Sequence, residues 1–266
     1  MTRITTRQLQ TWAQNDRKIV MVTCYDATFA RLVEKAEVDA ILIGDSLGMV
    51  IQGHEHTIPV TLDEIIYHCR AVARACQRPH LVGDMPFGTY QGSADDAVKN
   101  ALRLMKEGCV QAIKLEGGER CAPIIERMTQ AGIPVMGHLG LTPQSVHQFG
   151  GYRIQGRSDD AADQLIRDAL ALQDAGCYAI VLEGIPSTLS ALVTSKLAIP
   201  TIGIGAGVNC DGQVLVLYDL LGLDDRFNPK FLKKYDDMGG SVVDALQAFA
   251  GEVRDGAFPT LAHCHH

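Results

Sequence analysis

The chain has 266 residues, of which 47% are hydrophobic and 21% are charged, as in a globular protein with a substantial core. Its net charge of −7, without a run of Lys or Arg, disfavours nucleic-acid binding, since no basic surface exists to displace phosphate counterions. We expect no membrane association, because no apolar stretch approaches about eighteen residues. Eight cysteines without a C-x-x-C pair, and no signal-peptide core, indicate a cytosolic protein with reduced thiols.

Apolar, β-branched segments recur along the chain and predict parallel strands that are buried on both faces. We expect strands at 19–26, 40–46, 80–86, 112–118, 133–140, 179–185, 201–207 and 213–219. Amphipathic segments predict helices between them, at 27–37, 61–77, 93–108, 120–132, 158–176 and 186–198. This alternation predicts an α/β fold, a (β/α)8 TIM barrel, and not an open doubly wound sheet. The last connection, between the seventh and eighth strands, is too short for a full helix.

Two of these helices have clear end signals. Ser93 and Ser158 are expected as N-caps, and Gly108 and Gly176 are expected where the same helices end. Such punctuation supports the helix assignment, because a cap satisfies backbone groups that have no partner inside the helix.

The barrel is expected to carry additional helices at both ends of the chain. An N-terminal helix should precede the first strand, and C-terminal helices are expected at 227–238 and 241–256. No linker or low-complexity segment interrupts the pattern, which predicts a single domain over residues 1–266. Within the segment GHLGLTPQSV, Pro143 is expected to start a helix with Thr142 as its N-cap, and we interpret this feature as structural.

Acidic residues end four of the predicted strands, at Asp45, Asp84, Glu116 and Glu183. In barrels of this kind the active site lies at the carboxyl ends of the strands, so polar residues there indicate chemistry. Residues i and i+2 of a strand point the same way, which should bring Lys114 and Glu116 into the same space.

A single acid at a strand end is as readily a helix N-cap or a surface ion pair, and Asp26 and Ser46 are most open to that interpretation. Three acids at matching places on three strands are harder to explain so. Their charges would raise one another's pKa unless a cation or a proton intervened. A hard divalent cation such as Mg²⁺, which takes oxygen ligands, is the economical solution. No His or Cys cluster offers a zinc site instead.

The residues at the strand ends, with the sequence around them, resemble the ketopantoate hydroxymethyltransferase family. The matching segments cover most of the chain in order: TCYDATFARL, GDSLGMVIQGHEHTIPVTLDEIIYH, DMPFGTY, KLEGG, GHLGLTPQSV, GGYRIQGR, VLEGIP and IPTIGIGAG. Several are long and unusual, so the resemblance is specific. The C-terminal FPTLAHCHH departs from the family's usual ending, so nothing is carried over to the tail.

The resemblance implies a barrel of the phosphoenolpyruvate/pyruvate-binding type and a set of site residues. It implies a Mg²⁺ site made by Asp45, Asp84 and Glu116. The residues that it implies for binding the 2-oxo acid are Asp45, Ser46, Asp84, Lys114 and His138. Glu183 is implied as the proton acceptor, and Tyr25 as a further residue of the pocket. His138 remains a rival for the proton transfer.

The activity implied is transfer of a hydroxymethyl group from 5,10-methylenetetrahydrofolate to 3-methyl-2-oxobutanoate, which gives 2-dehydropantoate for pantothenate biosynthesis. The resemblance further implies a cytoplasmic homodecamer of two pentameric rings. Two other classes stay open on the residues: a Mg²⁺-dependent carbon–carbon lyase or phosphoenolpyruvate mutase that acts on a 2-oxo acid, and a non-catalytic barrel that binds a small acid. The nucleophilic KKCGH loop of the isocitrate lyase type is not present in the sequence.

Overall fold

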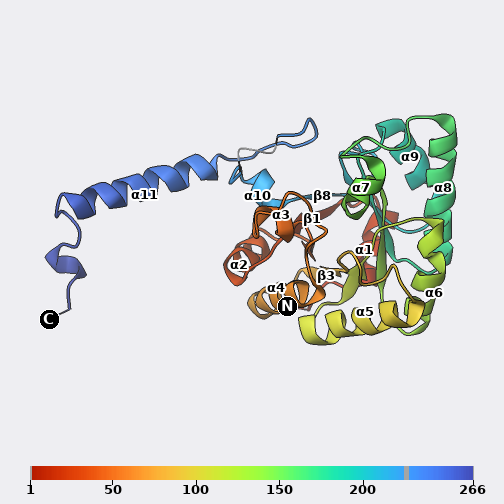
Figure 1. Ribbon diagram of the computed structural model, residues 1–266, viewed down its shortest axis with the longest axis horizontal. Coiled ribbons are helices and arrows are strands. Elements are labelled where there is room, and N and C mark those ends of the chain that lie inside the picture. Colours follow the sequence, from red (N-terminus) through yellow and green to blue (C-terminus); the bar gives the residue numbers. More distant parts are fainter. Residues whose placement is uncertain (1, 225–227, 266) are drawn as a thin grey trace. The chain divides into compact units, whose positions relative to one another are not determined.

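The computed structural model describes residues 2–224 and 228–265. Within them eight parallel strands close into a barrel in chain order, with β8 paired to β1 (Figure 1). The strands are β1 (Ile19–Thr23), β2 (Ala40–Ile43), β3 (His80–Asp84), β4 (Ala112–Lys114), β5 (Val135–Gly140), β6 (Ala179–Glu183), β7 (Thr201–Ile204) and β8 (Gly212–Leu215). The predicted (β/α)8 barrel is confirmed, although most strands are shorter than the apolar segments that predicted them.

Each of the six helices predicted between strands is present, and short helical turns add to them (Figure 1). The helices of this part are α1 (Thr6–Gln14), α2 (Ala27–Lys35), α3 (Leu47–Val50), α4 (Leu62–Ala75), α5 (Ala94–Gly108), α6 (Ala122–Gln130), α7 (Val146–Phe149), α8 (Asp159–Asp174) and α9 (Ser187–Lys196). Two 3₁₀ turns, η1 (Glu119–Cys121) and η2 (Pro143–Ser145), follow β4 and β5. Helix α1 is the expected N-terminal helix, and the connection from β7 to β8 contains no helix.

The helix ends follow the sequence. The side chains of Ser93 and Ser158 accept hydrogen bonds from the backbone of the first turns of α5 and α8, as predicted. Gly108 is the last residue of α5, followed by Cys109 in the left-handed conformation with φ 58°, and Gly176 follows the end of α8 with φ 95°. A Cβ on Gly108 would lie 2.9 Å from the Cβ of Cys69 in α4, so close packing of the two helices explains this glycine.

The chain divides into two compact units, Met1–Val216 and Leu217–His266. The first contains the whole barrel, and the second contains α10 (Leu217–Leu220), α11 (Met238–Arg254) and the 3₁₀ turn η3 (Leu261–His263). A single domain over 1–266 stays a prediction.

The helix predicted at 241–256 is confirmed as α11, which begins three residues earlier. The helix predicted at 227–238 is wrong for residues 228–237, which form turns and irregular structure; residue 227 lies outside the described residues. Asp237 explains the boundary, because its side chain accepts a hydrogen bond from the backbone N–H of Gly240 as the N-cap of α11.

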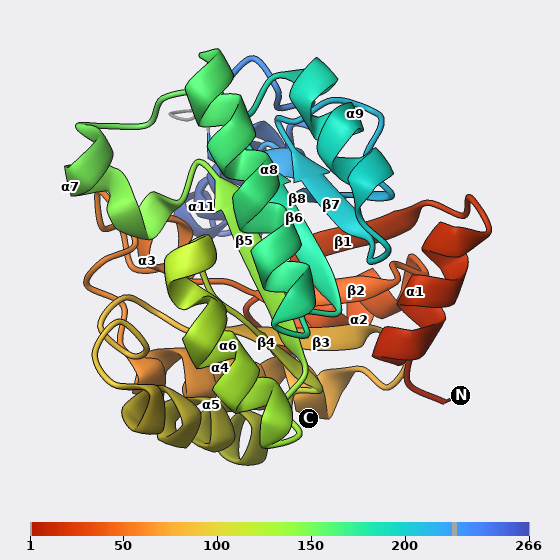
Figure 2. The ribbon, with the colours of Figure 1, turned by 90° about the vertical axis from the view of Figure 1, so that its right-hand side faces the viewer.

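The amino end of the barrel is closed by apolar side chains and by the N-terminal segment. Leu9 of α1 and Ile4 belong to the same buried cluster as side chains from inside the barrel. Figure 2 shows α1 at one end of the strands and α3 and α7 at the other. Fully buried His80 connects the N-terminal segment with the barrel. Its Nδ1 lies 3.0 Å from the carbonyl of Ile4 and its Nε2 lies 3.1 Å from the hydroxyl of Tyr178. The active site is therefore expected at the opposite, carboxyl end of the barrel.

We expect the free energy of unfolding to decrease as the pH falls from 6.5 towards 4. Burial lowers the pKa of His80 from 6.5 to about 4, so the unfolded chain takes up a proton there that the folded chain does not. Above pH 6.5 the stabilisation by neutral His80 is fully present. It is lost as the pH falls to about 4, and the loss amounts to about 3 kcal/mol. Urea unfolding of wild type and His80→Gln at pH 6.5 and 4.5 measures it. An equally steep pH dependence in the variant would contradict this role of His80.

Candidate active site

The strand register brings the predicted acids to one end of the barrel. Asp84 is the last residue of β3 and pairs in register with Lys114, the last residue of β4. Glu183 is the last residue of β6. Asp45 and Glu116 lie two residues beyond the last residues of β2 and β4. All of them therefore stand at the carboxyl ends of the strands, where the sequence placed them.

The ammonium group of Lys114 lies among the acids. Its Nζ is 3.0 Å from Asp84 Oδ1, 3.8 Å from Glu116 Oε1 and 3.3 Å from His138 Nδ1. All four residues are buried, with no more than 4% of each exposed. Burial lowers the pKa of Lys114, but the charges of Asp84 and Glu116 outweigh it and raise that pKa above its usual value. The expectation that Lys114 and Glu116 enter one space is confirmed.

His138 lies inside β5 and links two of the acids. Its Nδ1 is 3.3 Å from Glu116 Oε1, and its Nε2 is 3.2 Å from Glu183 Oε2. Burial and the Lys114 charge lower the pKa of His138, but its contacts with Glu116 and Glu183 prevail and raise it to about 9. Glu183 differs from the other acids, because 18% of its side chain is exposed compared with 2% for Glu116.

Two polar residues that the sequence analysis did not single out complete the cluster. Gln144 donates from Nε2 to Asp45 Oδ2 at 2.8 Å and from its backbone N–H to Glu116 Oε2 at 3.0 Å. The hydroxyl of Tyr90 donates to Gln144 Oε1 at 2.7 Å. Both side chains are buried. Pro143 does begin η2, but Thr142 makes no capping hydrogen bond with its side chain, and the segment carries a site residue as well as a helix start.

Ser46 and Asp26 take different roles. Asp26 is the N-cap of α2, and its Oδ1 accepts hydrogen bonds from the backbone of Thr28 and Phe29 at 2.7 and 2.9 Å. The capping interpretation is confirmed for Asp26. Ser46 occupies the N-cap position of α3 without a capping hydrogen bond, and its Oγ lies 2.8 Å from the Tyr25 hydroxyl. Ser46 is thus next to Asp45, and its hydroxyl makes a hydrogen bond with the hydroxyl of Tyr25 in the loop after β1.

The carboxylates fit a divalent cation by their charge and chemistry. Burial and the negative charges of Asp84 and Glu116 raise the pKa of Asp45 well above its usual range, as expected for a carboxyl group buried beside other acids. Fully ionised, the four carboxylates of the cluster with Lys114 and His138 carry a net charge of −2. A hard dication that takes oxygen ligands would neutralise that charge.

The side-chain arrangement itself is not that of a formed metal centre. Among residues 2–224 and 228–265, no three His, Cys, Asp or Glu side chains are grouped as ligands for a metal ion. The Lys114 ammonium contacts Asp84 Oδ1 and Glu116 Oε1 and supplies part of the counter-charge of these acids; the metal site stays a proposal.

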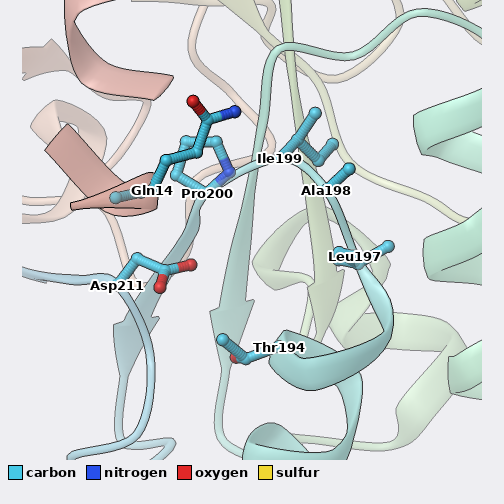
Figure 3. A pocket seen from close by; sticks show the side chains of 8 residues that line it. Gln14, Thr194, Leu197, Ala198, Ile199, Pro200 and Asp211 are labelled. Atoms are coloured by element: carbon cyan, nitrogen blue, oxygen red, sulfur yellow. The ribbon is translucent and has the colours of Figure 1, made fainter. Parts of the chain in front are cut away.

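Two hollows lie outside this cluster. One, of about 330 Å³, lies at the amino end of β7 and β8 and is lined by Gln14, Pro200 and Asp211 among others (Figure 3). The Asp211 carboxylate already accepts hydrogen bonds from Thr201, and the hollow is at the end of the barrel away from the acids. The second, of about 680 Å³, is lined by residues that follow β4 and β5, such as Gly117 and Thr142, and by the first half of α8.

A closed (β/α)8 barrel with buried acids, a lysine and a histidine at the carboxyl ends of its strands defines an α/β-barrel enzyme. Solved structures share this fold with the chain. A phosphonopyruvate hydrolase in complex with oxalate and Mg²⁺ is 16% identical, with a TM-score of 0.62, 97% of this chain and 93% of that chain covered. A 2,3-dimethylmalate lyase of the PEP mutase/isocitrate lyase superfamily is 17% identical, with a TM-score of 0.62 and coverage of 100% and 92%.

The family model of ketopantoate hydroxymethyltransferase matches residues 3–261. A relative from Anaeromyxobacter sp. (strain Fw109-5) named 3-methyl-2-oxobutanoate hydroxymethyltransferase is 57% identical over 268 residues, which are 99% of this chain and 88% of the relative. A relative of the same name from Heliobacterium modesticaldum is 51% identical over 261 residues, 98% of this chain and 95% of the relative. The chain therefore belongs to the ketopantoate hydroxymethyltransferase family.

Within the part of the chain that the structure describes, no helix is both long enough and apolar enough to cross a membrane.

Proposed function

We propose that the chain carries out a hydroxymethyl transfer in which 3-methyl-2-oxobutanoate, 5,10-methylenetetrahydrofolate and water give 2-dehydropantoate and tetrahydrofolate. The observation that carries this proposal is the buried group of Asp84, Lys114, Glu116 and His138 at the strand ends of a chain that belongs to this enzyme family. The reaction needs a proton removed from C3 and negative charge stabilised on the 2-oxo oxygen. Glu183, beside this group, would accept the proton, and Lys114 and a bound Mg²⁺ would stabilise the negative charge.

Asp45, Asp84 and Glu116 would hold Mg²⁺, which would supply a Lewis acid for the 2-oxo group. The burial of these three acids, and the hydrogen bonds through Gln144 and the Asp45 backbone that link them, support this assignment. A phosphonopyruvate hydrolase of the same fold has been solved with oxalate and Mg²⁺, so a barrel of this fold can be solved with that cation and a small acid. Mg²⁺ is the expected ion, and other divalent cations that accept oxygen ligands would also fit.

Glu183 would accept the C3 proton. Among the acids it has the exposed side chain, so a substrate can reach it, and it makes no ion pair with Lys114. His138 Nε2 lies 3.2 Å from the Glu183 carboxylate. Burial lowers the pKa of His138, but its contacts with Glu116 and Glu183 raise that pKa to about 9, which favours Glu183 over His138 as the acceptor. Lys114 would stabilise the charge that develops on the 2-oxo oxygen, and Ser46 would bind the substrate beside Asp45.

The folate would lie in the hollow of about 680 Å³ beyond β4 and β5. Its lining combines apolar side chains, Leu139, Phe149 and Leu165, with polar ones such as Gln164. This mixture suits a flat heteroaromatic ring that also makes hydrogen bonds. Part of the segment GGYRIQGR also lines the hollow, through Gln155 and Gly156.

From the family we also infer a cytoplasmic homodecamer of two pentameric rings. Sedimentation velocity of the purified protein tests the assembly, and a species of about ten times 28.8 kDa is expected.

The activity is tested by mass spectrometry of the product. Wild-type protein with Mg²⁺, 3-methyl-2-oxobutanoate and 5,10-methylenetetrahydrofolate should form 2-dehydropantoate, and omission of the folate should stop its formation. If the chain instead cleaved a carbon–carbon bond of a 2-oxo acid without folate, the lyase alternative would hold. A protein that bound the oxo acid and changed nothing would be the non-catalytic barrel.

Removal of the divalent cation should abolish product formation, and added Mg²⁺ should restore it. The reason is that the 2-oxo group would lose its Lewis acid and the carboxylates their counter-charge. Assays after chelation with EDTA and dialysis, with and without added Mg²⁺, measure this. Full activity in cation-free buffer would contradict the metal assignment.

A further inference from the structure

We propose that Gln144 is a positioning residue that fixes which carboxylate oxygen of Asp45 and of Glu116 faces the cation. This inference rests on the proposed function, because it takes both acids as cation ligands. Gln144 contacts neither the substrate nor the cation in this account. It acts through the two carboxylates with which it makes hydrogen bonds.

The three acids share one pattern, in which a neutral N–H group holds one oxygen of each carboxylate. Asp45 Oδ2 accepts from Gln144 Nε2 at 2.8 Å, and Glu116 Oε2 accepts from the Gln144 backbone N–H at 3.0 Å. Asp84 Oδ2 accepts from the backbone N–H of Asp45 at 3.1 Å. The second oxygens of Asp84 and Glu116 face Lys114 at 3.0 and 3.8 Å. Gln144 supplies two of these three restraints.

The orientation of the Gln144 amide follows from its partners. The Met85 carbonyl, 3.0 Å from Nε2, and the Asp45 carboxylate can only accept hydrogen bonds, so both must face the NH₂ group. The Tyr90 hydroxyl accepts from the backbone N–H of Glu116 at 3.1 Å and donates its proton to Gln144 Oε1 at 2.7 Å. A flipped amide would oppose two acceptors, and the network therefore specifies one rotamer.

This arrangement matters because a restrained carboxylate offers its second oxygen in a fixed direction before the cation arrives. Without the restraint, Asp45 and Glu116 can rotate, and the ordering then has to be made on binding. Loss of a group that orients metal ligands typically weakens metal affinity about 10- to 100-fold. Loss of the Gln144 amide would also remove the hydrogen bonds that Asp45 Oδ2 and the Tyr90 hydroxyl make with it in a buried site.

The test compares Mn²⁺ binding to wild type and Gln144→Met by electron paramagnetic resonance, with Mn²⁺ as the probe cation. Met has a similar length and removes both polar atoms of the side chain, so the variant loses the restraint on Asp45 and keeps the backbone hydrogen bond to Glu116. We expect the dissociation constant to rise about 10- to 100-fold. In assays with Mg²⁺ the concentration for half-maximal activity should rise by a similar factor, while excess Mg²⁺ restores much of kcat. A side chain that only stabilised the fold would not produce this dependence on cation concentration.

Gln111→Met is the matched control. Gln111 is a half-buried amide at the amino end of β4, and its Oε1 accepts from the backbone N–H of Leu81 at 3.1 Å. Its loss removes a comparable hydrogen bond away from the acids, and Mn²⁺ affinity should be unchanged. Tyr90→Phe is the second variant, and it keeps the inference testable if Gln144→Met does not fold. It removes the bond that orients the amide, together with the contact of the hydroxyl with the Glu116 backbone N–H, and should weaken Mn²⁺ binding severalfold.

The outcomes separate this inference from the proposed function. Suppose that wild type binds Mn²⁺ and that folded Gln144→Met binds it with an affinity within twofold of wild type. That result overturns the positioning role alone, and so does an unchanged Mn²⁺ affinity in Tyr90→Phe. Wild type that binds no Mn²⁺ contradicts the cation site, and this inference falls with it. Weaker binding in both variants and unchanged binding in Gln111→Met supports it.

Discussion

Glu183→Gln should lower the rate at which the C3 hydrogen of 3-methyl-2-oxobutanoate exchanges with deuterium by about 10²- to 10⁴-fold, the usual contribution of a general base. The amide keeps the shape of the side chain but cannot accept the proton. Exchange in D₂O with Mg²⁺ and without folate, followed by proton NMR, isolates this step from hydroxymethyl transfer. Binding of the oxo acid should change little, because Lys114 and the other acids remain.

Glu126→Gln is the control for this experiment, since it makes the same change on the exposed face of α6 and should exchange at the wild-type rate. The rival base is tested in the same assay with His138→Gln. Wild-type exchange in Glu183→Gln together with lost exchange in His138→Gln would transfer the role of base to His138.

Asp84→Asn should have the second large effect, on both cation binding and stability. It removes a proposed ligand of the cation and the closest ion-pair partner of Lys114, at 3.0 Å. Since loss of a group that merely orients a ligand costs about 10- to 100-fold, we expect Mg²⁺ affinity to fall at least a hundredfold. Breaking a buried ion pair from one side should also cost about 3 kcal/mol of unfolding free energy. Calorimetric titration with Mg²⁺ and urea unfolding measure the two effects.

Asp39→Asn provides the matched control. Asp39 is also buried and also paired with cations, with its Oδ1 at 2.9 Å from Arg17 and 3.5 Å from Arg78, but it precedes β2 at the amino end of the barrel. This variant should lose stability and still bind Mg²⁺ like wild type. Equal Mg²⁺ affinity in Asp84→Asn and Asp39→Asn would remove Asp84 from the cation site.

The barrel was predictable because strands covered on both faces leave unbroken apolar segments in the sequence. The ends of the strands were harder to predict. The segment 112–118 predicted a long fourth strand, but β4 is Ala112–Lys114, because pairing stops while buried side chains continue towards the site. Gly108 ends α5 as predicted, but its close packing against Cys69 depends on a neighbouring helix and could not be predicted from the sequence.

The acids of the site were predictable because a charged residue after a buried strand has few explanations other than a cap or chemistry. Their partner Gln144 was not. It lies 99 residues from Asp45 along the chain, and it reaches that carboxylate only because the loop after β5 folds over the barrel mouth. An amide in a polar segment carries no charge or periodicity that marks it in one sequence, and its role depends on distances that only the folded chain provides.

The central claim is that Asp45, Asp84 and Glu116 hold the cation while Glu183 is left free to accept the proton. Crystals soaked with Mn²⁺ and 3-methyl-2-oxobutanoate test it directly, because Mn²⁺ produces an anomalous signal that locates the ion. The account predicts one peak with oxygens of those three carboxylates as ligands and Glu183 outside the coordination sphere facing C3. A peak elsewhere, or one with Glu183 as a ligand, would contradict it.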